Sequence, residues 1–248
     1  MCPLGTVAAT NWVEMKTRGR LAWKVCAALL ALTAQADAQN LLVNGGFEVN
    51  DRSTYANYYP SEDLAYLSQP DVLPGWSFGH SVDLYGAARA PQSGSQFLDL
   101  VGGGPLTQTF FVEQAFATTP GQVYALSFYY GNNENLATAL ATFTASLIGG
   151  SGTLWTQSFS HTGDTYSARN WAFFTTLFTA NSASTILRFL DTSAFATDYN
   201  PTYTVGGSTL DNVAVIAAVP EPGGILTAVL IGGFCCLPLL RRLRSAAR

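Results

Sequence analysis

The chain has 248 residues, of which 48% are hydrophobic and only 11% are charged, and this length accommodates one large β domain or two small ones. Between Gln39 and Pro222 there are fourteen Asp and Glu, four Arg and no Lys, so this region carries a net charge of about −10. Binding to phosphates requires a basic surface, so this balance argues against nucleic acid as a partner and leaves calcium, neutral glycans or other proteins. The same region lacks disulfides and zinc–thiolate chemistry, because the cysteines are Cys2, Cys26, Cys235 and Cys236.

Residues 1–38 have the three parts of a secretory signal peptide. A basic start at residues 16–24 precedes an apolar run at residues 25–32 and a small-residue cleavage motif at residues 36–38. We expect a signal helix, cleavage after the motif, and export. A complete signal already begins at Met15, which makes the preceding residues an over-extended start. The alternative is a membrane anchor that is never cleaved, although the apolar run is short for a span.

Short period-two runs separated by Gly, Pro, Asn and Asp fill the middle of the chain and predict strands. The expected strands are residues 76–85, 96–100, 107–116, 123–130, 139–148, 153–160, 171–179, 185–190 and 209–216. Residues 123–130 alternate, with Tyr124, Leu126 and Phe128 on one face, which indicates one core face and one wet or shallowly covered face. Residues 171–178 carry large apolar side chains on both faces, which predicts a central strand. Nine or ten strands without a βαβ pattern predict an all-β fold, a two-sheet jelly-roll sandwich at residues 39–217.

Two further segments precede the main series of strands. Residues 40–48 suggest a short apolar strand broken by Asn-Gly-Gly, which leaves Glu48 fixed at the edge of whatever the strand packs on. Residues 50–74 show little alternation and are rich in Tyr, so we expect a long functional or disordered loop whose tyrosines pack on the sandwich.

Residues 218–248 form a tail of a different character. In this tail a Val-Pro-Glu-Pro motif at residues 219–222 is followed by an apolar run at residues 225–240 and then by a basic end. The apolar run predicts a short membrane helix. The motif and basic residues are Val219, Pro220, Glu221, Pro222, Arg241, Arg242 and Arg244. This order resembles the PEP-CTERM sorting signal of exported proteins in Gram-negative bacteria. The resemblance implies processing by an exosortase, an inner-membrane precursor, a final place at the cell surface or in the extracellular matrix, and association with exopolysaccharide and biofilm. An ordinary tail anchor is the alternative.

Six short motifs in order span most of residues 39–217. They are Asn44-Gly45-Gly46-Phe47-Glu48, Leu73-Pro74-Gly75-Trp76, Ser81-Val82-Asp83-Leu84, Gly94-Ser95-Gln96-Phe97-Leu98-Asp99-Leu100, Gln114-Ala115-Phe116 before Pro120-Gly121-Gln122-Val123-Tyr124, and Leu210-Asp211-Asn212-Val213-Ala214-Val215. With these motifs the domain resembles the choice-of-anchor C family, related to DUF642 domains and, more distantly, to carbohydrate-binding modules with the galactose-binding jelly-roll fold. The Tyr-rich insertion after Glu48 and the loop at residues 197–207 depart from that pattern.

The resemblance implies a structural Ca²⁺ where the first and last strands meet, with Glu48 and Asp211 as ligands. Two carboxylates together with carbonyl and Asn oxygens suit Ca²⁺, which takes six to eight oxygen ligands. The alternative is that both carboxylates accept hydrogen bonds from backbone amides at strand ends.

Sugar binding requires flat aromatic rings on a wet face, beside Asn, Asp or Arg side chains. The candidates are Tyr85, Tyr129, Trp155 and Trp171, whereas Trp76 follows Pro-Gly and is expected in the core. We expect no enzyme, because the only histidines are His80 and His161 and no Gly-x-Ser-x-Gly motif occurs. The sequence therefore predicts an exported carbohydrate-binding-like protein. The alternatives are a structural or adhesive matrix protein and a glycosidase with two facing carboxylates.

Overall fold

The computed structural model describes residues 39–68, 71–103, 108–133, 140–193 and 207–218. The predicted signal peptide, the loop at residues 197–206, the sorting motif and the membrane helix at residues 225–240 lie outside these ranges. Within the described ranges no helix is long and apolar enough to cross a membrane.

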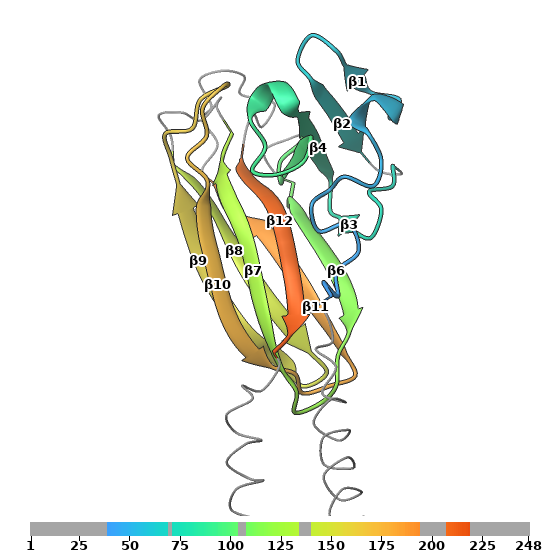
Figure 1. Ribbon diagram of the computed structural model, residues 1–248, viewed down its shortest axis with the longest axis vertical. Coiled ribbons are helices and arrows are strands. Elements are labelled where there is room, and N and C mark those ends of the chain that lie inside the picture. Colours follow the sequence, from blue (N-terminus) through green and yellow to red (C-terminus); the bar gives the residue numbers. More distant parts are fainter. Residues whose placement is uncertain (1–38, 69–70, 104–107, 134–139, 194–206, 219–248) are drawn as a thin grey trace, which may run out of the picture. The chain divides into compact units, whose positions relative to one another are not determined.

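Two antiparallel sheets form the described domain, as predicted for an all-β jelly-roll sandwich (Figure 1). The seven-stranded sheet has the order β1 (Tyr58–Tyr59), β2 (Leu64–Ser68), β4 (Ser81–Gly86), β5 (Gln96–Asp99), β12 (Ser208–Ala217), β7 (Val123–Asn132) and β10 (Ala172–Thr179). The five-stranded sheet has the order β3 (Ser77–Phe78), β6 (Phe111–Ala117), β11 (Ser184–Asp191), β8 (Ala141–Gly149) and β9 (Gly152–His161). Two short 3₁₀ turns, η1 (Arg52–Thr54) and η2 (Ala87–Arg89), complete the elements.

The core lies between the two sheets and follows the predicted alternation. In β7 the side chains of Tyr124, Leu126 and Phe128 are buried, and the intervening residues are partly exposed. Phe128 contacts the ring of Phe189 from β11 edge to face, with centroids 5.1 Å apart. Aromatic contacts of this kind add about 0.5–1.5 kcal/mol to the burial of apolar area, so they help hold the two sheets together.

The predicted strand at residues 76–85 is wrong, because it is two strands in different sheets. β3 pairs with β6 in the five-stranded sheet, and β4 pairs with β2 and β5 in the seven-stranded sheet. The chain crosses between the sheets at Gly79, whose amide donates to the Phe111 carbonyl at 3.0 Å. A Cβ at this position would lie 2.6 Å from the Thr109 carbonyl oxygen, so the crossing requires glycine.

Residues 40–48 do not form the predicted strand. They nevertheless lie along β12, the last strand of the domain in sequence order. The Leu41 amide donates to the Val215 carbonyl, and the Val213 amide donates to the Gly45 carbonyl, each at 2.8 Å. Between these bonds the Asn40 side chain both donates to and accepts from the backbone of β12. An Asn side chain therefore replaces part of a strand ladder, which alternation alone does not predict.

The long segment at residues 50–74 contains strands that the sequence did not reveal. β1 and β2 extend the seven-stranded sheet beyond β4. Tyr55 and Tyr58 pack against the core, as expected for this segment. In β2, Ala65 and Leu67 point inward and are fully buried.

Candidate functional site

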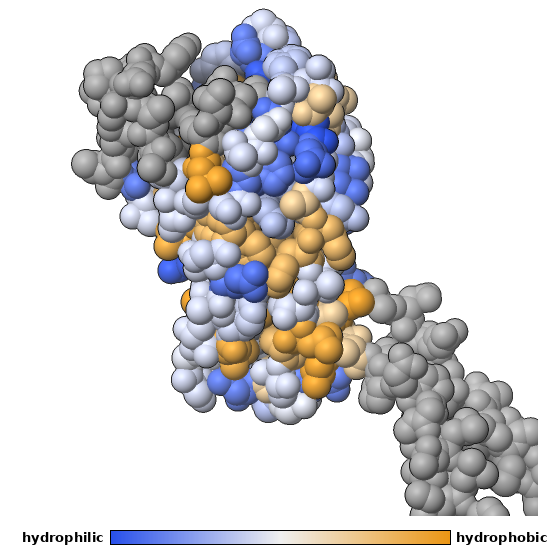
Figure 2. Space-filling view, turned by 90° about the vertical axis from the view of Figure 1, so that its left-hand side faces the viewer, coloured by the Kyte–Doolittle hydropathy of each residue, from blue (hydrophilic) through white to orange (hydrophobic). Residues whose placement is uncertain are grey.

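The outer face of the seven-stranded sheet, which points away from the core, has an open part over β7 and β10. We call it the open face, and its members are Ala125, Ser127 and Tyr129 from β7 and Phe173, Thr175 and Leu177 from β10. Phe173 is 56% exposed and Leu177 is 64% exposed, which is unusual for large apolar side chains in a β-strand. Figure 2 views the side of the domain that carries β9 and β10 and shows apolar surface interrupting polar surface there.

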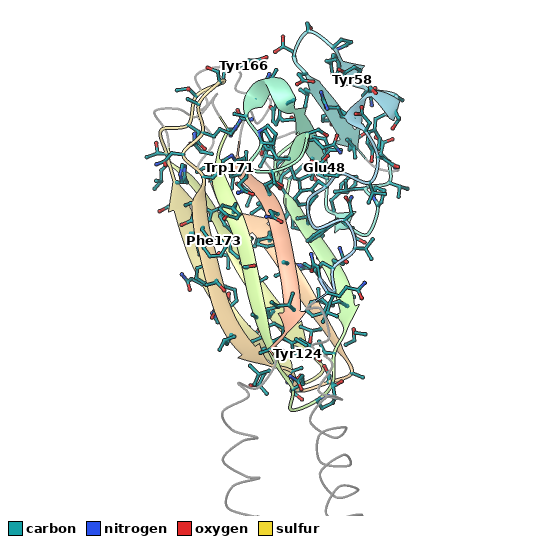
Figure 3. All side chains as sticks on the ribbon, in the orientation of Figure 1. Glu48, Tyr58, Tyr124, Tyr166, Trp171 and Phe173 are labelled. Carbon is teal, nitrogen blue, oxygen red and sulfur yellow. The ribbon has the colours of Figure 1, made fainter. Side chains whose placement is uncertain are left out.

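The prediction of a central strand at residues 171–178 is therefore wrong. β10 is the last strand of its sheet and pairs only with β7. Its inward side chains include the buried Phe178, and its outward side chains Phe173 and Leu177 meet solvent (Figure 3). Apolar residues on both faces of a strand predict cover on both faces, but none of the described segments covers the second face of β10.

An aromatic pair lies at one end of the open face. Phe173 is directly opposite Tyr129 in the strand register, with ring centroids 4.9 Å apart and an angle of 46° between the planes. Hydroxyl groups follow along the same two strands, because Thr175 lies opposite Ser127. The Thr175 hydroxyl donates to the Leu126 carbonyl at 3.1 Å, so its oxygen keeps lone pairs that can accept hydrogen bonds. The face combines rings that can stack with groups that can hydrogen-bond.

Among the four predicted ligand-binding aromatics, only Tyr129 belongs to the open face. Tyr85 is 3% exposed, and its hydroxyl accepts a hydrogen bond from the Asn133 side chain at 2.9 Å, so its ring offers no face to a ligand. Trp155 is half-buried and stacks on Phe174 at the edge of the core, with centroids 5.5 Å apart. We therefore leave Tyr85 and Trp155 out of the candidate site.

Trp171 and Trp76 are held in place by hydrogen bonds from their indole nitrogens. Trp171 is half-buried and donates to the Ala90 carbonyl at 3.1 Å, while its ring meets Phe97 edge to face (Figure 3). Trp76 is buried and donates to the Asn44 carbonyl at 3.0 Å, which confirms its expected place in the core. Phe173, in contrast, was missed by sequence reasoning, although the apolar residues on both faces of β10 were the signal that could have found it.

The outer face is closed over β4 and β5, where it holds a pair of buried carboxyl groups. Asp83 and Asp99 lie directly opposite each other on these strands, and both are buried. Asp99 accepts hydrogen bonds from the Val101 amide and the Asn133 side chain, yet burial raises its pKa to about 7. Burial, and next the charge of Asp99, raise the pKa of Asp83 well above its ordinary value. Within the described residues, Asp83 Oδ1 has no hydrogen-bond partner.

Two arginines close this part of the face. The Arg89 guanidinium lies between the rings of Tyr85 and Tyr166, 4.3 and 4.6 Å from their centroids. Arg169 lies over Phe97 and donates to the backbone carbonyls of Arg89 and Asn132. Fixed arginines therefore cover the β4 and β5 part of the sheet, whereas no described arginine side chain stacks on the open face.

The two predicted metal ligands both bind the loop at residues 92–96. Glu48 accepts hydrogen bonds from the Ser95 amide and hydroxyl and from the Gln96 amide, at 2.7–2.9 Å. Asp211 accepts from the backbone amides of Gln92 and Ser93 at 2.9 and 3.1 Å and from the amide of Asn212.

The charges of Glu48 and Asp211 repel each other, which would favour a cation beside this loop. Burial, and to a smaller extent the nearby charge of Glu48, raise the pKa of Asp211 to about 7, although the hydrogen bonds from Ser93, Asn212 and Gln92 lower it. A cation at the pair would remove that repulsion. Glu48 Oε2 and Asp211 Oδ1 each accept a single hydrogen bond and keep a lone pair for it. The hydrogen bonds nevertheless satisfy both carboxylates without a metal, and no cluster of three or more His, Cys, Asp or Glu that could hold a metal occurs among the described residues. Calcium at Glu48 and Asp211 stays a prediction.

The two histidines are engaged in hydrogen bonds with the fold. His80 Nδ1 is 3.1 Å from the Ser81 hydroxyl, and both ring nitrogens of His161 contact Asn side-chain or backbone oxygens. The open face itself contains no carboxylate and no imidazole. It can bind a ligand, but its own side chains cannot supply a general acid–base pair.

Comparison with known families connects this geometry to a sequence family. The family described as "Protein of unknown function (DUF642)" matches residues 40–216. The chain belongs to the DUF642 family. The match begins at the Asn40 segment and ends in β12, so the DUF642 region contains the open face and both predicted metal ligands. No curated protein sequence matches the chain.

Solved structures similar to this DUF642 protein include carbohydrate-binding modules. TmCBM61, determined in complex with β-1,4-galactotriose, has a TM-score of 0.42 and 12% identity, over 73% of this chain and 100% of that chain. A CBM4 structure has a TM-score of 0.40 and 15% identity, over 71% and 99% of the two chains. The CBM22-1 xylan-binding domain of Paenibacillus barcinonensis Xyn10C has a TM-score of 0.38 and 17% identity, over 64% and 97%.

Proposed function

We propose that this protein is a non-catalytic glycan-binding protein whose open face stacks against the pyranose rings of a polysaccharide. The observation that carries the proposal is the pair of Phe173, which is 56% exposed, and the half-buried Tyr129, whose ring centroids lie 4.9 Å apart on an open sheet face. Contiguous apolar surface that is rimmed by polar residues marks interaction sites on soluble domains.

The chemistry of a pyranose matches this surface. One side of the sugar ring is a patch of C–H groups that can lie on an aromatic ring, and its hydroxyls project from the rim. On the protein the rings of Phe173 and Tyr129 supply the apolar contact, and Thr175 and Ser127 place hydroxyl groups beside them. A flat sheet surface suits an extended chain, which can contact both strands at once.

Ring-removal variants test the proposal on a panel of soluble polysaccharides. Phe173→Ala and Tyr129→Ala are each expected to weaken binding about tenfold, which corresponds to about 1.4 kcal/mol. Phe173→Leu keeps the apolar volume and removes the flat ring, so it separates stacking from general hydrophobic contact. Tyr59→Ala removes an exposed aromatic from β1 and serves as the matched control. Undiminished binding of all three open-face variants would refute the proposal.

We further propose the cellular context that the termini imply. Export through the signal at residues 1–38, processing by an exosortase at the PEP-CTERM motif, and delivery to the cell surface or matrix of a Gram-negative bacterium would bring the domain to exopolysaccharide. These steps rest on the sequence patterns alone. Sorting and glycan binding are separate claims, and each has its own test.

A structural or adhesive role without glycan is favoured by the opposite sheet. On its outer surface the hydroxyls of Thr144 and Ser158 are 3.0 Å apart, and those of Ser146 and Thr156 are 2.9 Å apart. The paired hydroxyls of β8 and β9 resemble the Ser/Thr surface expected of a structural protein. If matrix attachment persists in Phe173→Ala while Thr144→Val abolishes it, this alternative replaces glycan binding.

A further inference from the structure

The arginine side chains of the described domain form ion pairs with carboxylates of the same domain. Between Gln39 and Pro222 the sequence has four arginines and no lysine. Each arginine side chain lies within 4.0 Å of an Asp or Glu oxygen of the same chain. The four pairs are Arg52–Asp63, Arg89–Glu62, Arg169–Asp164 and Arg188–Glu113.

These pairs cannot turn toward a ligand on the open face. Arg89 and Arg169 are buried and held by stacking and by hydrogen bonds to backbone carbonyls. Arg52 is largely buried, and Asp63 accepts from its Nε at 2.6 Å. Arg188 is the most exposed, with 40% of its side chain accessible, but it lies on β11, in the sheet opposite the open face.

The formal net charge of the domain is therefore negative, and the open face itself presents no charged side chain. Residues 39–222 contain fourteen Asp and Glu and four Arg, so their formal net charge is about −10. A uronate or a sulfate on a bound glycan would lose its water without gaining a cationic partner, and burying an unpaired charge is strongly unfavourable. It would also meet repulsion over about 8–10 Å at physiological salt. A neutral sugar meets neither penalty.

We propose that the ligand of the open face is a neutral polysaccharide, and that uronate-containing and sulfated chains are rejected. This inference rests on the proposed function, because it names the chemical class that the same surface accepts. It gives the acidic composition of the domain a role in selecting among polymers that share a backbone. The Tyr129 and Phe173 rings hold the sugar, and the absence of a free cation sets the specificity.

The test compares two soluble polymers with one backbone, hydroxyethylcellulose and carboxymethylcellulose, by affinity electrophoresis and calorimetry of the purified full-length protein. A galactan paired with polygalacturonate provides a second backbone. EDTA is present throughout, because a divalent cation at Glu48 and Asp211 could bridge the protein to carboxylates. We expect the neutral member of a pair to bind at least tenfold more tightly. We also expect its affinity to change little between low and high salt, while the residual binding of the anionic member rises with salt.

A charge-gain variant sharpens the comparison. Thr175→Lys places an ammonium group on the open face, and we expect it to raise affinity for the carboxylated chain at least fivefold. Thr156→Lys adds the same charge to the exposed surface of β9 in the other sheet and should leave that affinity unchanged.

The outcomes separate the two claims. Carboxylated chains that bind as tightly as neutral ones in EDTA, with the binding lost in Phe173→Ala, would overturn the ligand class and leave glycan binding standing. Binding of neither member of either pair would overturn glycan binding itself. Equal gains from Thr175→Lys and Thr156→Lys would show that net charge and not the open face governs the interaction, which would also overturn the inference.

Discussion

The buried carboxyl group of Asp99 predicts that the domain loses stability as pH rises. Burial raises its pKa to about 7 in the folded protein, against an ordinary value of 3.8. Between pH 3.8 and pH 7 the Asp99 carboxyl group therefore keeps its proton in the folded state and has released it in the unfolded state. Stability from this proton is fully present below about pH 4 and disappears as pH rises through 7.

The magnitude follows from the size of the pKa shift. One pKa unit corresponds to 1.36 kcal/mol, so the full effect of Asp99 is about 4 kcal/mol and the part between pH 5 and pH 8 is about 3 kcal/mol. For a domain of this size 1 kcal/mol moves the melting temperature by about 2–4 °C. We therefore expect the melting temperature to fall by roughly 6–12 °C from pH 5 to pH 8 through this residue alone. Asp83 and Asp211 act in the same direction, because burial raises their pKa values as well.

Thermal unfolding in EDTA at a series of pH values measures the effect, with Asp99→Asn as the variant. Asparagine keeps the shape and does not titrate, so the decline between pH 5 and pH 8 should be smaller by about 3 kcal/mol in the variant. Asp51→Asn is the control, because Asp51 is exposed and the hydrogen bonds from Ser53 lower its pKa. A wild-type melting temperature that rises between pH 5 and pH 8, or an Asp99→Asn slope equal to that of wild type, would refute the reasoning.

Three other predictions concern the first turn, the metal and the tail. A Cβ at Gly45 would lie 2.0 Å from the Val213 carbonyl oxygen, so Gly45→Ala should destabilise the domain by about 3 kcal/mol or more in thermal unfolding. At Gly46 the atom nearest to an added Cβ is 3.8 Å away, so Gly46→Ala should be nearly neutral. Millimolar Ca²⁺ should raise the melting temperature relative to EDTA in the wild type and not in Glu48→Gln, and an unchanged melting temperature would remove the calcium site. Replacing Pro220-Glu221-Pro222 with alanines should leave the protein unprocessed in the inner membrane, and normal processing on an immunoblot would exclude the sorting motif.

Strand identity could be predicted well from the sequence because the sandwich has a strong period of two. The alternation in β7 and β8 follows from side chains that point alternately into the core and out of it. Gly79 shows the limit of this signal, since a strand pattern that continues through a glycine conceals a crossing from one sheet to the other. Residues 40–48 show another limit, because there the Asn40 side chain supplies hydrogen bonds that a strand backbone would otherwise make.

The candidate site could be predicted only in part, because periodicity does not reveal what covers a sheet face. Tyr85 and Tyr129 both point outward from the seven-stranded sheet and look equivalent in the sequence. Arg89 lies over Tyr85, which is buried, and no such arginine contact is found at Tyr129 among the described residues. Phe173 looked like a core residue for the converse reason, since no segment among the described residues covers it to the extent that a core position requires.

The covered and open parts of this sheet also predict that stability and ligand affinity respond differently to pH. Asp211 lies opposite Tyr129 in the register, at the border of the open face, but its carboxylate binds the amides of Gln92 and Ser93. A neutral sugar stacked on Phe173 and Tyr129 makes no contact that titrates near pH 7. Its affinity, measured by calorimetry below the melting temperature, should therefore change less than about twofold between pH 5.5 and pH 8, while the melting temperature falls. An affinity that follows a single titration near pH 7 in the wild type, and loses it in Asp211→Asn, would show that Asp211 reaches the ligand and that the open face extends onto β12.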